Sequence, residues 1–234
     1  MTNLIMLAAG RGSRLGSLTD QIPKALNVFR GKTLIEHVLD SANKSKINFN
    51  NRVIIGGYKS EKFENFDCTI IKNGEWETTG PFYSLNLARN YLQEEECIVT
   101  YTDIIYSPNF LTEIQSIREE IVLPSNINFL NSWQNRKIDI NSDLETFVVN
   151  GGYLKEIGGK IEDIGKVEGQ FSGIVKFTPA GWRRFTDVIY KIEYNKLDMT
   201  SVMSQFIQNQ GGISVVNVEG FWQEFDNPDD FNIS

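Results

Sequence analysis

The chain has 234 residues, a formal net charge of −7 at pH 7, a hydrophobic share of 41% and an aromatic share of 12%. This composition predicts a well-packed globular protein and excludes a disordered chain, because there is enough apolar surface to form a core. The acidic balance excludes a general binder of nucleic acid or of membrane surfaces, since such proteins need a basic face.

The sequence also carries signals about the compartment of the protein. It contains no run of about 18 apolar residues, so we expect no membrane-spanning helix. The N-terminus enters an apolar strand at once, which leaves no room for a signal peptide. Cys68 and Cys97 are the only cysteines and stand in apolar, strand-like surroundings, which predicts reduced and buried thiols. We therefore expect a cytoplasmic protein.

A predicted first strand at residues 4–7 runs into a loop that combines small and basic residues. Small residues at 8–10 let the backbone lie against a ligand, and Arg11, Arg14 and Lys24 follow. Such a loop can hold a polyphosphate, because backbone N–H groups point into its concavity and guanidinium groups neutralise phosphate oxygens. Two commoner phosphate loops are excluded, since no Lys-Ser or Lys-Thr pair follows the glycines and the glycine spacing does not fit the dinucleotide fingerprint.

The next segments alternate between helical and strand patterns. Residues 33–43 carry apolar side chains at helical spacing, with Thr33 or Lys32 near the start, whereas residues 52–58 and 68–71 are typical of strands. This alternation favours an α/β domain with a largely parallel sheet. Ligands of such sheets bind at the carboxyl ends of the strands, where the loop after the first strand already lies.

Residues 73–85 form a second informative stretch. Thr79 or Gly80 can cap a helix, and Pro81 suits the first turn of that helix. Apolar residues at 82, 85, 88 and 92 then face a core. A loop followed by a well-capped helix explains most of this composition without any ligand.

Acidic residues close two apolar strands that lie far apart in the chain. Asp103 follows a strand predicted at residues 97–100, and residues 221–226 form an alternating strand that places Trp222, Glu224 and Asp226 on one face. A carboxylate at the end of a buried strand is costly without a partner, and Mg²⁺ prefers anionic oxygen ligands. We expect Asp103 and Asp226, with Glu224, to converge on one cation, although acidic strand ends are also common on surfaces.

The remaining segments complete the pattern without a repeat, a linker or a low-complexity stretch. Residues 131–136 are expected to form an exposed loop or helix, and residues 169–177 a loop entering a strand. Further strands are predicted at 120–123 and 213–218, a hairpin with a glycine-rich turn at 146–158, and helices from 179 and over 199–207. We therefore expect one domain spanning residues 1–234.

The string L-A-A-G-x-G-x-R-L from Leu7 to Leu15, closed by P-K-x-L at 23–26, resembles the signature of nucleotidyltransferases that make activated sugars and phospho-alcohols. The likeness extends along nearly the whole chain, to residues 79–85, 101–106, 169–173, 197–201 and 222–226. Together these stretches are most similar to the small cytidylyltransferases of the sugar-nucleotidyltransferase superfamily, which load CMP onto phosphocholine, aminoethylphosphonate or glutamine phosphate. The resemblance implies a single Rossmann-like nucleotidyltransferase domain with a mixed, mostly parallel central sheet flanked by helices.

The resemblance also implies a reaction and roles for residues. An oxygen of the acceptor's phosphate or phosphonate attacks the α-phosphorus of CTP, and pyrophosphate leaves. Lys24, Arg14 and Asp103 are the catalytic candidates, with Lys24 between the two reacting phosphates and both arginines on the triphosphate tail. Asp103, Asp226 and Glu224 are the expected ligands of Mg²⁺. The residues expected to bind the nucleotide are Leu7, Ala8, Ala9, Gly10, Arg11, Gly12, Ser13, Arg14, Lys24, Thr79, Gly80 and Ser84.

The acceptor is left open. Aromatic residues favour a quaternary ammonium group, whereas Gln170, which stands where related phosphonate enzymes often carry an acid, favours an amino-acid-like acceptor such as glutamine phosphate. Such products would serve the decoration of capsules, surface polysaccharides or lipids. Candidate acceptor contacts are Tyr106, Trp133, Lys160, Gln170 and Phe171.

Other function classes remain as alternatives. A sugar-1-phosphate nucleotidyltransferase would keep the chemistry and make an NDP-sugar. A glycosyltransferase would not need paired arginines for a triphosphate tail, and a degenerate nucleotide-binding protein would not need the full set of basic and acidic residues. The expected partners are CTP and a small phosphorylated acceptor, without nucleic acid or membrane, and a homodimer is one of the oligomeric states that the sequence allows.

Overall fold

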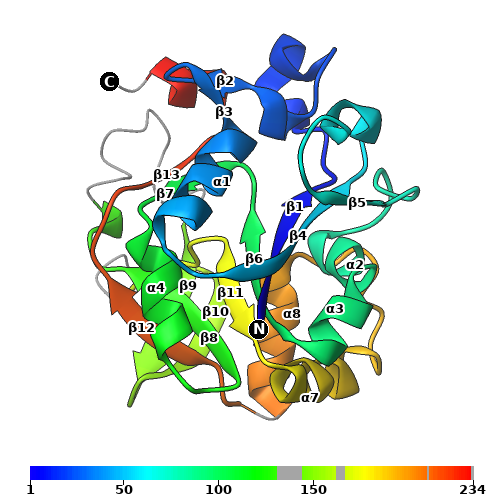
Figure 1. Cartoon of the computed structure of the whole chain (residues 1–234). Helices are drawn as coiled ribbons and strands as arrows, with labels where there is room; N and C mark the ends of the chain where they lie inside the picture. The colour runs from blue at the N-terminus through cyan, green and yellow to red at the C-terminus, as the bar shows by residue number, and fades with distance from the viewer. Residues whose placement is uncertain (131–143, 162–166, 210, 233–234) are drawn as a thin grey trace.

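A nine-stranded sheet runs through the molecule (Figure 1). The computed structural model describes residues 1–130, 144–161, 167–209 and 211–232. The strands of the sheet are β1 (Thr2–Ala8), β4 (Phe49–Gly56), β5 (Thr69–Lys72), β6 (Glu96–Tyr101), β8 (Ile121–Asn126), β9 (Glu145–Asn150), β10 (Tyr153–Lys160), β11 (Ile174–Phe177) and β12 (Ser214–Val218). Their order is β5-β4-β1-β6-β11-β8-β12-β10-β9.

Most of these strands point in one direction. β5, β4, β1 and β6 are parallel neighbours, and β8 pairs in parallel with β12. Among the described strands of the sheet, β11 and β10 run against their neighbours. The prediction of an α/β fold with a mixed, mostly parallel sheet is therefore confirmed.

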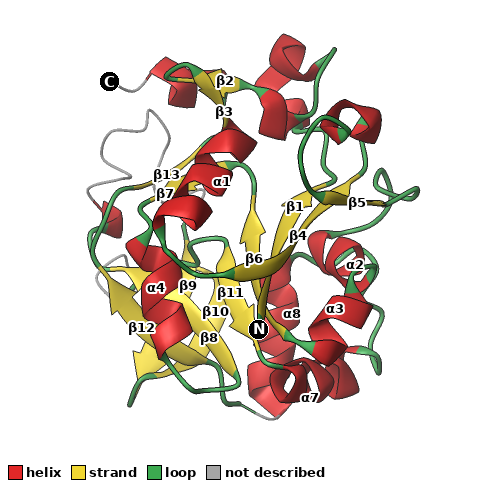
Figure 2. Cartoon of the chain, in the orientation of Figure 1, coloured by secondary structure: helices red, strands yellow, loops and turns green. Residues whose placement is uncertain are grey.

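Helices cover both faces of the sheet (Figure 2). β1 is buried along its whole length, and its side chains alternate between two apolar clusters: Leu4 and Met6 pack with α1 and α4, whereas Ile5 and Leu7 pack with the other helices. This is the pattern of a strand that is covered on both sides. The helices are α1 (Leu34–Lys44), α2 (Pro81–Asn86), α3 (Arg89–Glu94), α4 (Asn109–Ser116), α7 (Pro179–Ile189) and α8 (Met199–Asn209).

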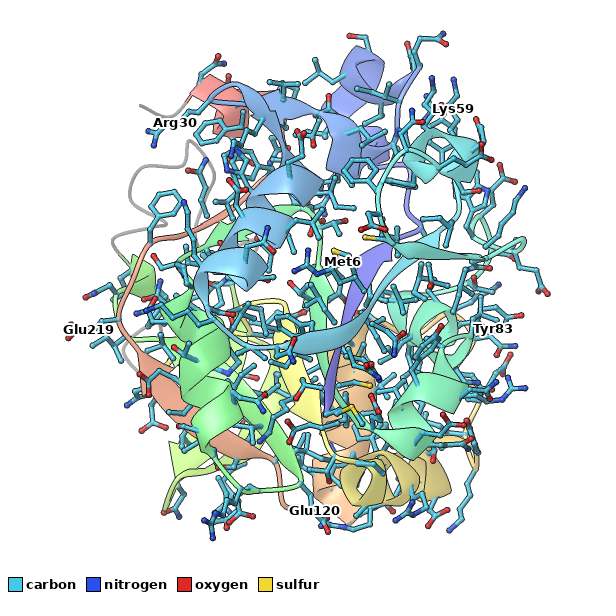
Figure 3. All side chains as sticks on the ribbon, viewed as in Figure 1. Met6, Arg30, Lys59, Tyr83, Glu120 and Glu219 are labelled. Carbon is cyan, nitrogen blue, oxygen red and sulfur yellow. The ribbon has the colours of Figure 1, made fainter. Side chains whose placement is uncertain are left out.

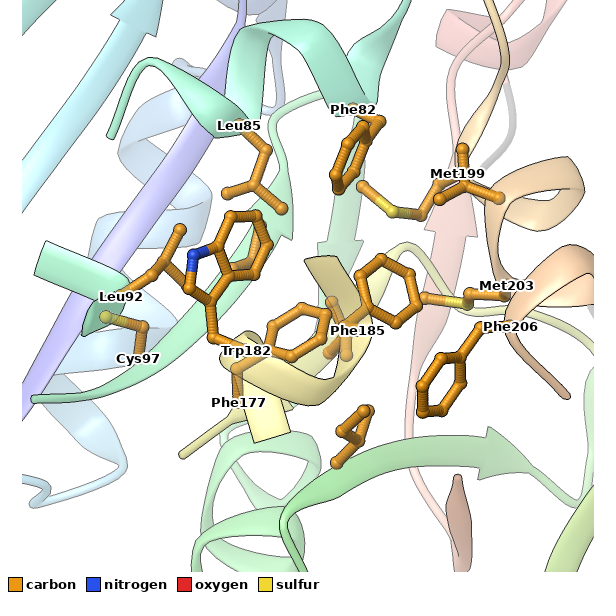
Figure 4. Close-up of a cluster of buried hydrophobic side chains, with 14 of the residues drawn as sticks. Phe82, Leu85, Leu92, Cys97, Phe177, Trp182, Phe185, Met199, Met203 and Phe206 are labelled. Carbon is orange, nitrogen blue, oxygen red and sulfur yellow. The ribbon is translucent and has the colours of Figure 1, made fainter. Parts of the chain in front are cut away.

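The cluster between the sheet and α2, α7 and α8 is rich in aromatic rings (Figure 4). Trp182 lies 5.8 Å from the ring of Phe82 and 5.5 Å from that of Phe177, and Phe185 lies 5.0 Å from Phe206. All five side chains are fully buried, so their large apolar area makes this cluster a major source of stability. Figure 3 shows the contrast between interior and surface: Met6 lies inside, while charged side chains lie at the periphery.

A second, two-stranded sheet stands at the end of the large one. In it β13 (Trp222–Glu224) pairs antiparallel with β7 (Ile104–Tyr106). A further small ladder joins β2 (Val28–Phe29) to β3 (Lys32–Thr33), and short 3-10 helices cover residues Ser13–Thr19, Lys24–Leu26, Ser60–Phe63 and Pro228–Asn232. No helix in the described part of the chain is long and apolar enough to span a membrane.

The structure corrects two local predictions. The helix that begins at Pro81 does not continue to residue 92, because the chain leaves regular helix at Leu87 and Ala88 and resumes as α3. Cys97 is fully buried in β6, where burial raises the pKa of its thiol to about 12. Cys68, which we expected to be buried as well, is only partly buried, because it precedes β5 at the border of the sheet.

Candidate active site

Two ladders bring Asp103 and Asp226 together. β1 and β6 are parallel neighbours, so the loop after Ala8 and the residues after Tyr101 emerge at the same edge of the sheet. The hydroxyl of Thr102 donates to the carbonyl of Leu7 across 2.8 Å and fixes this juncture. The β7–β13 ladder continues past its last pair, where the Phe225 N–H donates to the Asp103 carbonyl at 2.9 Å. Asp226 therefore follows directly beside Asp103.

Lys24 lies between these two carboxylates. Its Nζ is 2.7 Å from Oδ2 of Asp103 and 2.6 Å from Oδ1 of Asp226. Arg14 adds a second cation, with Nη2 at 3.0 Å from the same Asp226 oxygen. Gly12 lets the Lys24 side chain lie close to the backbone of the loop. Its φ is +74°, and a Cβ at this position would lie 2.7 Å from the Lys24 side chain.

The charges of this cluster are mutually dependent. Lys24 is largely buried, with 12% of its side chain exposed, and the Asp226 side chain is 5% exposed. Burial lowers the pKa of the Lys24 ammonium, but the two carboxylates raise it by more, so its pKa lies above the ordinary value. Lys24 is therefore a permanent cation at neutral pH, held where two anions meet.

A cavity of about 190 Å³ opens beside this cluster, along the loop after β1. It collects nine residues that the sequence predicts to bind the nucleotide: Leu7, Ala8, Ala9, Gly10, Gly12, Lys24, Thr79, Gly80 and Ser84. Gly80 is the N-cap of α2, and its N–H donates to the carbonyl of Asn195 at 2.6 Å. The cavity thus joins two segments that the sequence singles out separately.

A second cavity of about 330 Å³ lies on the other side of the carboxylates. Pro81, Tyr101 and Asp103 line both cavities, so the two adjoin at the carboxylate cluster. The larger one collects Arg14, Asp103, Glu224, Asp226, Gln170 and Phe171 from the predicted site residues. The alternation predicted for residues 221–226 is confirmed, since Trp222, Glu224 and Asp226 all face this cavity.

In the part of the chain that the structure describes, the two arginines of the first loop form ion pairs with different carboxylates. Arg11 pairs with Asp20 at 2.9 Å, and its guanidinium lies 5.6 Å from the centre of the Tyr58 ring. Arg14 turns the other way, toward Asp226. Ser13 is exposed at the start of the 3-10 helix Ser13–Thr19. A joint grip of both arginines on one anion stays a prediction, and it would require Arg11 to leave Asp20.

Two of the acceptor candidates that the structure describes, Tyr106 and Lys160, line neither cavity. The structure corrects the expectation for Tyr106, which is 2% exposed and packs against Phe110 in the core between the sheet and α4. Ile104, two residues earlier on the same face of β7, lines the larger cavity in its place. Lys160 is exposed at the end of β10, opposite Glu145 on β9. Trp133 lies outside the described residues.

Several lining residues escape the sequence analysis. Tyr101 and Thr102 directly precede Asp103, so their place beside a strand end was a usable signal. Asp198 stands at the start of α8, where its carboxylate accepts from the Ser201 N–H at 2.7 Å, a pattern typical of an N-cap. Nothing in the local sequence around Trp76 or Glu145 marks either as a cavity residue. The added lining residues include Trp76, Tyr101, Thr102, Glu145, Thr146, Asp198, Met199 and Thr200.

The donor chemistry of the cluster fits a hard divalent cation in part. Asp103 and Asp226 both bind a single cationic atom, which shows that their oxygens converge on one point. Within the described residues, however, no group of three or more His, Cys, Asp or Glu side chains forms a ready metal site. Glu224 lines the same cavity without completing such a group. A metal ion bound by the same two oxygens that now contact Lys24 would displace its ammonium.

The segment of the chain that lines the smaller cavity matches a known family of domains. Residues 4–126 match the family model described as the MobA-like NTP transferase domain, a match that runs from β1 to β8. The chain belongs to this family. The matched part of this NTP transferase contains the loop after β1, Lys24 and Asp103, whereas Asp226 lies beyond it. The protein is accordingly a nucleotidyltransferase.

Among individual proteins, the chain is similar to several cytidylyltransferases. The CTP:phosphoglutamine cytidylyltransferase of Campylobacter jejuni subsp. jejuni serotype O:2 is 24% identical over 253 aligned residues, which cover 99% of this NTP transferase and 98% of the relative. The choline-phosphate cytidylyltransferase of Haemophilus influenzae is 34% identical over 116 residues, 47% of this chain and 48% of that one. A solved CTP:phosphocholine cytidylyltransferase from Streptococcus pneumoniae has a TM-score of 0.75 at 23% identity, covering 99% and 96% of the two chains. The resemblance to small cytidylyltransferases is confirmed.

Proposed function

We propose that this nucleotidyltransferase transfers CMP from CTP to a small phosphorylated or phosphonate molecule and releases pyrophosphate. The observation that carries the proposal is the meeting of two cavities at Lys24, Asp103 and Asp226. The smaller cavity, built on the loop after β1, would hold the nucleotide, and the larger one the acceptor. The full-length likeness to a CTP:phosphoglutamine cytidylyltransferase supports CTP as the donor.

The transfer would be an in-line displacement that depends on position and charge. An acceptor oxygen attacks the α-phosphorus, the bond to the β-phosphate oxygen breaks, and pyrophosphate leaves with that electron pair. Lys24 lines the smaller cavity, and its ammonium contacts Asp103 and Asp226, which line the larger one, so it can neutralise the two anions as they approach. Arg14, which is 63% exposed, can swing from Asp226 to the departing pyrophosphate.

A divalent metal such as Mg²⁺ would be held by Asp103 and Asp226, with Glu224 nearby, and would supply further neutralisation of the phosphate oxygens. Lys24 would then turn from the carboxylates to the phosphates. Arg11 would bind the triphosphate tail after leaving Asp20. Ser13, at the exposed start of its 3-10 helix, would also contact the nucleotide.

The acceptor class is set by the larger cavity. Gln170 and Phe171 line it together with Glu145 and Asp198, a mixture of aromatic and acidic groups that suits a phosphorylated molecule with an amino or ammonium group. Phosphocholine and glutamine phosphate both meet this description. We take residues 1–234 to act as one transferase domain, whose product would serve the decoration of surface polysaccharides or lipids.

Pyrophosphate release tests this function. The purified protein is incubated with Mg²⁺, each common nucleoside triphosphate, and a panel of phosphocholine, aminoethylphosphonate, glutamine phosphate and several sugar 1-phosphates. We expect turnover with CTP and one non-sugar acceptor. Turnover that requires a sugar 1-phosphate would replace this function with the synthesis of an NDP-sugar.

A further inference from the structure

Asn73 is a buried polar residue behind the smaller cavity. It follows β5, is 1% exposed, and its backbone N–H donates to the carbonyl of Gly56 at 2.7 Å. Its side-chain Oδ1 accepts from the Glu75 N–H at 2.9 Å. Because an N–H can only donate, this contact fixes the orientation of the amide and directs Nδ2 to the opposite side.

The amide nitrogen donates to two hydroxyls that line the cavity. Nδ2 of Asn73 lies 3.0 Å from Oγ1 of Thr79 and 3.0 Å from Oγ of Ser84. Each hydroxyl has a single proton, and each directs it to a backbone carbonyl: Thr79 to Glu75 at 2.8 Å, and Ser84 to Gly80 at 3.4 Å. Both oxygens therefore have only acceptor capacity left for a molecule in the cavity.

Two hydroxyls that can only accept a further hydrogen bond discriminate between pyrimidine bases. The exocyclic amino group of cytosine is a donor, whereas uracil and thymine carry an acceptor oxygen at the same position. An amino group beside the two hydroxyl oxygens would donate hydrogen bonds to their unused lone pairs. A carbonyl oxygen at the same place would face these oxygens with no proton between them. Rotating a hydroxyl toward that carbonyl would break its bond to the backbone, at a cost on the order of one hydrogen bond.

We propose that Asn73 is a positioning residue that sets the hydrogen-bond polarity of Thr79 and Ser84, and so makes the cavity select cytosine over uracil or thymine. This inference rests on the proposed function, because it assumes that the smaller cavity holds the base. It assigns the choice of nucleotide to a buried amide that does not line the cavity itself.

A pair of neighbouring threonines provides the test. Thr78 and Thr79 both donate to the Glu75 carbonyl, but only Thr79 receives the Asn73 amide and lines the cavity. The variants T79V, T78V and N73A are compared by kcat/KM for CTP and UTP, and by calorimetric binding of each nucleotide without acceptor. We expect T79V and N73A to lower the CTP-to-UTP ratio about tenfold through a higher KM for CTP, with T78V unchanged.

Three results would overturn the inference: T79V matching T78V, N73A lowering CTP and UTP alike, or wild-type protein binding both nucleotides equally. The calorimetric measurement separates this failure from that of the transferase function. A protein that prefers CTP in binding, loses the preference in T79V and releases no pyrophosphate would uphold the base selection and refute the transfer. A protein that turns over CTP and UTP at equal rates would do the reverse.

Discussion

At the scale of single residues, Lys24 is the side chain on which the site depends. It separates two carboxylates that would otherwise face each other in a partly buried place. Without it, Asp226 would keep Arg14, whereas Asp103 would lose the ion pair described here. The same ammonium stands where two phosphate groups are proposed to meet. Lys24 thus has both an electrostatic role in the free protein and a proposed role in catalysis.

We predict that Lys24→Ala lowers kcat by about a hundredfold or more, the loss typical of removing one preorganised charge-stabilising group. The assay is pyrophosphate release with CTP and the acceptor found in the panel. Lys72→Ala is the matched control, since Lys72 is exposed at the end of β5. Circular dichroism shows whether the variant is folded. A folded Lys24→Ala protein with near-normal kcat would remove Lys24 from the mechanism.

At the scale of elements, α1 supports the ladder that carries the carboxylates. Its apolar residues Ile35, Val38 and Ala42 enter the same cluster as Tyr106 of β7, and the Ser41 hydroxyl donates to the Tyr106 carbonyl. The helix begins with a capping box, in which Thr33 accepts from the Glu36 N–H and the Glu36 carboxylate accepts from the Thr33 N–H. The cap therefore fixes the start of a helix that backs the site.

We predict that Thr33→Ala destabilises the protein by about 1 kcal/mol in urea unfolding at pH 7, whereas Thr33→Ser, which keeps the cap, costs much less. Hydrogen bonds from Thr33 lower the pKa of Glu36. A lowered pKa in the folded state means that this contribution is present above the unfolded value of about 4.3 and is lost as the pH falls through the folded value. The gap between wild type and Thr33→Ala should narrow at low pH. A gap that is constant with pH would mean that Glu36 takes no part.

At the scale of the whole molecule, the site joins the two ends of the chain. Lys24 and Asp226 are 202 positions apart and lie within one hydrogen bond. The carboxylates are balanced by Lys24 and Arg14, which belong to the protein itself. The folded state therefore has its own counter-charges at the place where a metal would bind.

We predict that excess EDTA abolishes pyrophosphate release but shifts the melting temperature by less than about 2 °C, a change smaller than about 1 kcal/mol for a chain of this size. Added Mg²⁺ should restore turnover. The measurements are a thermal melt and the pyrophosphate assay on the same sample. A large drop in melting temperature would mean that a metal holds the carboxylates in the fold, and full activity in EDTA would refute the proposed metal.

Local sequence patterns were sufficient to predict most helices and strands, and also the loop after β1 that lines the smaller cavity. An apolar run followed by Ala8, Ala9 and Gly10 predicts a buried strand and a ligand-binding loop, and β1 and the smaller cavity follow that pattern. The alternation around Glu224 likewise predicts which side chains of β13 share a face. These properties depend on the period of a strand and on the size of adjacent side chains, which are written in consecutive residues.

Tertiary structure decided how the predicted site residues meet and which partners each of them has. The pairing of β13 with β7 brings Asp226 to Asp103, and the turn of the chain after Gly12 brings Lys24 between them. The same packing buries Tyr106, sends Arg11 to Asp20, and encloses Asn73 behind the cavity. None of these is a property of a window of neighbouring residues, because each depends on the order of strands and on the side chains that other segments place opposite.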